Sequence, residues 1–109
     1  MKKAVWISYD LGVRGDYEGL YTWLDDHQAK ECVGNLAFIN YECDGDDLVG
    51  CLRKDLEQAV EVTKRMRIYV VWRDTKTQKI KGRFVCGGRR VSPWVGYGTA
   101  EEQTESDES

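Results

Sequence analysis

The 109-residue sequence has one proline, one histidine and two phenylalanines, and it has no long apolar run. A single histidine cannot supply a His–His metal pair, and it leaves little material for a Ser-His-Asp triad within one chain. The apolar stretch over residues 4–9 is far shorter than the roughly 20 residues that span a bilayer. It is also too short for a signal peptide, and no small-residue cleavage site follows it. We therefore expect a cytoplasmic protein without a membrane segment.

The four cysteines lack CxxC spacing, and in a cytoplasmic chain we expect them to be free and to pack as small apolar residues. Hydrophobic residues make up 41% of the chain, with four tryptophans and six tyrosines, which is typical of a folded globular protein. The length suits one domain. We expect that domain over residues 1–98, including a Gly/Arg/Trp-rich segment over 87–98. Residues 99–109 have too little apolar surface to fold and predict a disordered acidic tail.

Charge is distributed unevenly along the chain. Residues 1–63 contain thirteen acidic and six basic side chains, whereas residues 64–90 contain ten basic side chains and only Asp74. Residues 101–109 add five carboxylates and no base. A concentrated basic segment indicates a phosphate-rich or acidic partner. We also hypothesise that the acidic tail folds back over this basic segment as an electrostatic cover.

Hydrophobic periodicity predicts four strands and two helices. We expect strands over residues 4–10, 36–43, 67–73 and 80–86, because these stretches are rich in β-branched and aromatic residues. Apolar residues at helical spacing predict one helix that follows Asp16 and reaches His27, and a second over about 46–59. The Gly34-Asn35 pair is interpreted as a break between the first helix and the second strand.

The order β-α-β-α-β-β predicts an α+β, ferredoxin-like two-layer sandwich, an antiparallel sheet with two helices on one face. The other sheet face would stay open, and Trp6 with Val71 or Tyr69 would form an apolar patch on it. A homodimer through this open sheet face is the simplest way to bury the patch.

The first predicted strand ends in Ile7-Ser8-Tyr9-Asp10-Leu11. A strand ending in Tyr-Asp at the start of a small ferredoxin-like chain resembles the small CRISPR-associated ferredoxin-like nucleases and integration adaptors. It also resembles their stand-alone SinR-like relatives and the virulence-associated protein D ribonucleases, over residues 3–86.

The resemblance implies that Asp10 lies near a dimer axis, where two copies hold a divalent metal such as Mg²⁺ between them. Asp10 would then be both the metal ligand and the catalytic residue of a metal-dependent endonuclease. The alternative is structural: Asp10 ends a strand and accepts backbone hydrogen bonds in the following turn.

Glycines and arginines occur together over residues 82–93, which suits phosphate, and the aromatic residues that follow can stack on unpaired bases. Six of the predicted nucleic-acid contacts are cationic and one is aromatic: Arg67, Arg73, Lys81, Arg83, Arg89, Arg90 and Trp94. In the alternative, the arginines form a solvated face or pair with acidic residues of the same chain, and Trp94 packs against the sheet.

The leading functional prediction is a small nucleic-acid-associated protein of the CRISPR-associated type. The alternative is a non-catalytic protein-interaction or regulatory module of bacterial or phage origin. A third possibility is a small-ligand sensor that uses the Gly/Arg-rich loop. The sequence lacks a phosphate loop that ends in Lys-Ser/Thr, which argues against nucleotide hydrolysis.

Overall fold

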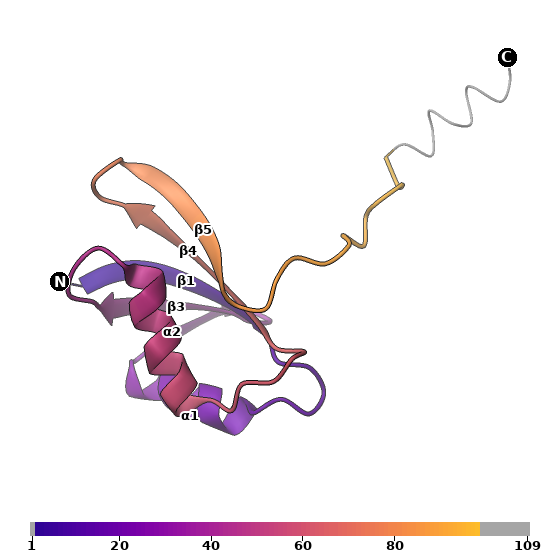
Figure 1. The fold of residues 1–109 in the computed structure, drawn as a ribbon, viewed down its shortest axis with the longest axis horizontal. Helices are drawn as coiled ribbons and strands as arrows, with labels where there is room; N and C mark the ends of the chain where they lie inside the picture. The colour runs from indigo at the N-terminus through magenta and orange to yellow at the C-terminus, as the bar shows by residue number, and fades with distance from the viewer. Residues whose placement is uncertain (1, 99–109) are drawn as a thin grey trace, which may run out of the picture.

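The structure, a computed structural model, describes residues 2–98 and contains a five-stranded sheet and two helices. The strands are β1 (Lys2–Asp10), β2 (Lys30–Val33), β3 (Leu36–Glu42), β4 (Arg67–Asp74) and β5 (Lys79–Cys86), and the helices are α1 (Tyr17–Asp26) and α2 (Leu48–Ala59). The strands pair antiparallel in the order β2-β3-β1-β4-β5, and both helices lie on one side of the sheet (Figure 1). The predicted α+β class and antiparallel sheet are confirmed.

The predicted order of elements is wrong at one point, because it lacks β2. All four side chains of this strand are exposed, so its sequence has neither an apolar run nor an alternating pattern. The Gly34-Asn35 pair joins β2 to β3, with Gly34 at φ 53°, a conformation that favours glycine. The predicted break is therefore the turn of a hairpin, and β2 is an edge strand paired only with β3.

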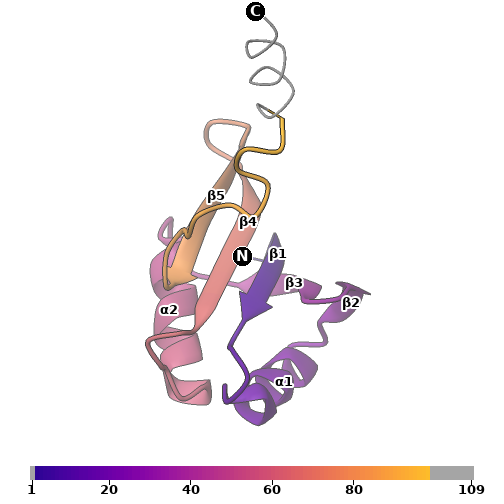
Figure 2. The same cartoon turned by 90° about the vertical axis from the view of Figure 1, so that its right-hand side faces the viewer.

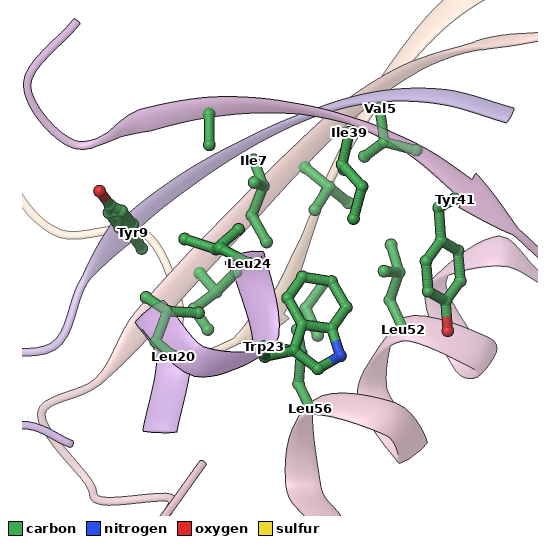
Figure 3. Packing of buried hydrophobic residues seen from close by; sticks show 14 of the residues in the cluster. Val5, Ile7, Tyr9, Leu20, Trp23, Leu24, Ile39, Tyr41, Leu52 and Leu56 are labelled. Atoms are coloured by element: carbon green, nitrogen blue, oxygen red, sulfur yellow. The ribbon is translucent and has the colours of Figure 1, made fainter. Parts of the chain in front are cut away.

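The core fills the space between the sheet and the helices. Figure 3 shows side chains of β1 and β3 pointing from the sheet toward the leucines of α1 and α2. On β1, every second residue from Val5 to Tyr9 is buried, while the residues between them face the other side of the sheet. The two sides of β1 are therefore different surfaces, one inside the core and one outside it.

Both helices begin with the same local arrangement, an aspartate followed three residues later by a glycine. The Asp16 carboxylate accepts hydrogen bonds from the Gly19 and Glu61 backbone N–H groups, each at 2.9 Å. The Glu61 N–H and then the Gly19 N–H hold the pKa of Asp16 below its ordinary value. Asp47 accepts from the Gly50 N–H at 2.9 Å. Each aspartate satisfies a backbone donor that the first helical turn leaves open.

These two glycines give the first prediction, a pair of substitutions to alanine. A methyl group on Gly19 would meet both the Asp16 carboxylate and the Ala59 main-chain oxygen, whereas the atoms nearest to one on Gly50 all belong to the Asp47 carboxylate. Gly19→Ala should therefore lower the free energy of unfolding by roughly 1–3 kcal/mol, as overpacking does, although alanine is the better helix former. Gly50→Ala should cost less, because the Asp47 side chain can turn aside.

Urea unfolding of the two variants measures the difference. A stabilised Gly19→Ala variant would contradict the close approach of α1 to the end of α2.

From Lys2 to Gly98, no helix is long and apolar enough to cross a membrane. The predicted acidic tail over residues 99–109, and its proposed return over the basic segment, lie outside the described residues.

Candidate nucleic-acid interface

The side of the sheet opposite the helices carries four aromatic side chains, and we call it the open sheet face. In the β1 register, Trp6 lies opposite Phe38 of β3 and Val71 of β4, so all three share this side. Tyr69 lies opposite Phe84 of β5 in the same way. Trp6 is 40% exposed and the other side chains are partly exposed. The predicted apolar patch around Trp6 is therefore present.

The four rings form two contacting pairs. The Trp6 and Phe38 ring centroids lie 5.0 Å apart with the planes tilted by 56°, and those of Tyr69 and Phe84 lie 4.8 Å apart at 69°. The Tyr69 ring extends over Gly82 of β5, where a methyl group would meet its phenol. Gly82 thus leaves space for the Tyr69 ring to lie against the sheet.

Sequence reasoning did not identify Phe38 and Phe84 as part of this surface. The alternation of buried and outward-facing residues within their strands could have identified them. Ala37 and Ile39 flank Phe38 and face the core, so Phe38 must face away from it. Val85, and not Ile80, is the buried apolar residue of β5, which leaves Phe84 on the open sheet face.

The predicted cationic contacts do not form one surface. Arg67 and Arg73 lie on the open sheet face, because they alternate with the buried Ile68 and Val70. Lys81 and Arg83 face the side of the helices, since they lie opposite Trp72 and Val70 in the β4–β5 register.

Lys81 is also engaged in an ion pair. Its Nζ lies 2.7 Å from Asp74 Oδ2, and this hydrogen bond lowers the pKa of Asp74 to about 2. Lys81 therefore contributes to the local structure of the hairpin. It lies on the helix side of the sheet and is not part of the open sheet face.

Three further predicted contacts follow β5, where the chain leaves the domain (Figure 2). Arg90 Nη2 donates to the Arg65 main-chain oxygen at 3.1 Å, and Arg89 is exposed. Trp94 is 70% exposed, so the alternative in which it packs against the sheet is wrong. Arg89, Arg90 and Trp94 thus belong to the segment that extends from the end of β5.

Asp10 has two partners at the end of β1. Its Oδ1 accepts a hydrogen bond from the Gly12 N–H at 3.1 Å, and its Oδ2 lies 3.4 Å from Arg67 Nη2. The hydrogen bond from the Gly12 N–H is the contact expected if Asp10 has a structural role, in which it ends the strand and accepts backbone hydrogen bonds in the following turn. Within residues 2–98, no group of three or more His, Cys, Asp or Glu side chains could hold a metal ion. A Mg²⁺ site at Asp10, which requires a second copy, stays a prediction.

Arg67 has unused hydrogen-bonding capacity. Its Nε is buried and makes no hydrogen bond within the described part of the chain. The Arg67 side chain borders a hollow of about 270 Å³. Residues of the open sheet face and of the end of β1 line this hollow. The lining residues are Ser8, Tyr9, Asp10, Arg67, Tyr69 and Phe84. A guanidinium group beside aromatic rings can bind a phosphate and a base together.

Comparisons of the chain with family models, curated proteins and solved structures gave no match. The resemblance to the CRISPR-associated nuclease group and its relatives therefore stays a prediction.

Proposed function

We propose that this chain is a small nucleic-acid-associated protein that binds single-stranded nucleic acid on the open sheet face. The observation that carries the proposal is the set of two ring pairs on this face, with Arg67 and Arg73 at the two ends of β4. Bases of any sequence stack on aromatic rings, and guanidinium groups bind the phosphates between them. β4 alternates cation, ring, apolar side chain and cation along one side.

A ferredoxin-like interpretation of the sheet supports this proposal. The strands β2-β3-β1-β4 follow the order expected of that fold, and β5 then extends the sheet beyond β4. Four-stranded sheets of RNA-binding domains stack bases on aromatic side chains of the uncovered face. Trp6 on the central strand occupies a comparable place.

Charge favours nucleic acid over a second copy of the chain as the partner of this face. Asp10 partly neutralises Arg67, but Arg73 hydrogen-bonds the neutral side chain of Gln78. Lys30 lies opposite Phe38 and adds a further positive charge to the same side. Two stacked copies would each present this excess of positive charge to the other, which costs free energy, whereas phosphates would neutralise it. The proposed activity is binding, and the endonuclease activity that the resemblance implies for Asp10 stays a separate prediction.

Two arginines on opposite sides of the β4–β5 hairpin test the proposal. Arg73→Ala should weaken the binding of a fluorescently labelled single-stranded oligonucleotide and should reduce the slope of log affinity against log salt by about 0.7, one phosphate contact. Arg83→Ala removes the same charge from the helix side and should leave affinity and slope nearly unchanged. Fluorescence anisotropy over a salt series measures both quantities.

Three results would argue against the proposal. Equal losses in the two variants would place the contact along the hairpin edge, away from the rings. Absence of binding at low salt would exclude a nucleic-acid ligand. A concentration-dependent doubling of mass in analytical ultracentrifugation, reversed by substitutions on the open sheet face, would assign that face to a homodimer.

A further inference from the structure

Two cysteines bring their thiols into contact on the helix side of the sheet. Cys43 directly follows β3 and is 3% exposed, and Cys51 lies in the first turns of α2 and is partly buried. Their Sγ atoms are 2.6 Å apart. Cys43 packs in the core as the sequence predicts, but it does so against a second thiol, eight residues away in the chain.

The backbone holds both thiols in place. The Cys51 N–H donates to the Asp47 main-chain oxygen at 3.0 Å, inside the first turn of α2, and the Tyr41 hydroxyl donates to the Cys51 main-chain oxygen at 3.2 Å. The Cys43 Sγ lies 3.9 Å from the same Asp47 oxygen, so it faces the start of the helix. The other cysteines lie elsewhere: Cys32 is on the edge strand β2, and Cys86 ends β5.

We propose that Cys43 and Cys51 form a reversible intramolecular disulfide, with a low-molecular-weight disulfide such as oxidised glutathione as the oxidant. The Cys51 thiolate attacks one glutathione sulfur and releases one glutathione thiolate. Cys43 then gives up its proton and attacks Cys51 Sγ of the mixed disulfide, which releases the second glutathione. The two protein thiols lose two electrons and two protons, and the oxidant is reduced to two thiols.

Exposure sets the order of the two steps. Cys51 is the more accessible thiol, whereas burial, followed by the hydrogen bond with Cys51, raises the pKa of Cys43 to about 11. A buried thiol with a raised pKa is a slow nucleophile toward an external oxidant. It can still attack Cys51 Sγ, because that sulfur is already in contact with it.

The bond would link the end of β3 to α2, and the loop of residues 44–47 between them contacts both the β4–β5 hairpin and β1. Asp46 forms an ion pair with Lys76 at 2.5 Å, and Gly45 accepts a hydrogen bond from Lys3 Nζ at 3.2 Å. Oxidation should therefore slow proteolytic cleavage in this loop. The site lies away from the open sheet face, so this inference does not depend on the proposed function.

The test uses the double variant Cys32→Ser/Cys86→Ser, in which the pair provides the only thiols. The protein is incubated with oxidised glutathione, quenched in acid and alkylated, and its mass is measured before and after reduction. We expect a mass lower by two hydrogens, no alkylation, and a single cross-linked peptide containing residues 43 and 51. Adding Cys51→Ser should abolish the intramolecular bond and leave Cys43 open to alkylation after unfolding.

Two results would overturn the inference. One is a double variant that keeps two alkylatable thiols after incubation with a large excess of oxidised glutathione. The other is a bond formed only between chains, seen as a dimer on a non-reducing gel.

Discussion

Replacing Leu52 with alanine should lower the free energy of unfolding by about 2–5 kcal/mol, the usual cost of emptying a buried leucine site. Leu52 is fully buried on α2 and points toward the sheet, near Tyr41 (Figure 3). A domain of this size has a total stability of about 5–15 kcal/mol, so the substitution removes a large part of it. Equilibrium unfolding in urea, followed by far-UV circular dichroism, measures the change.

Val62→Ala provides the matched control, because Val62 follows α2 and is 49% exposed. Removing methyl groups from an exposed site usually changes stability by less than about 0.5 kcal/mol. If Leu52→Ala costs no more than Val62→Ala, α2 does not cover the sheet as described. Val60 and Met66 of the segment after α2 already belong to the core, so a loss that is large for both variants would indicate that Val62 is buried there as well.

The sequence was sufficient to predict most elements, because their burial follows a simple period. β1, β3, β4 and β5 and both helices lie close to the predicted ranges, since each places apolar residues at a spacing of two or about 3.6. β2 was missed because all of its side chains are exposed. Its pairing with β3 comes from backbone hydrogen bonds and the Gly34 turn, which leave no hydrophobic pattern.

The candidate site was only partly predictable. The number of charged residues in a segment does not show which side of a strand each of these side chains faces. Arg73 and Lys81 lie eight residues apart in the same basic segment, yet they face opposite sides of the sheet. The Trp6–Phe38 contact depends on the register between β1 and β3, which local sequence does not determine. The contact between the Cys43 and Cys51 thiols likewise depends on how the end of β3 meets the start of α2.

Trp6→Ala should weaken the binding of single-stranded oligonucleotide by roughly 5- to 150-fold, which corresponds to about 1–3 kcal/mol for one stacked base. Trp6 lies on the central strand, and its 40% exposure leaves the ring accessible on the open sheet face. Trp6→Phe keeps a ring at the position and should retain most of the affinity. Tyr21→Ala removes a somewhat more exposed ring (52%) from α1, on the opposite side, and this variant should bind as the unchanged protein does.

An abasic oligonucleotide separates stacking from charge in the same experiment. The unchanged protein should bind the abasic strand more weakly than the strand with bases, because phosphate contacts alone remain. In Trp6→Ala this preference for bases should shrink by the same factor as the affinity loss, whereas in Arg73→Ala it should persist while both affinities fall. A base preference that survives Trp6→Ala undiminished would mean that the bases stack elsewhere, and Trp6 would then have no role in recognition.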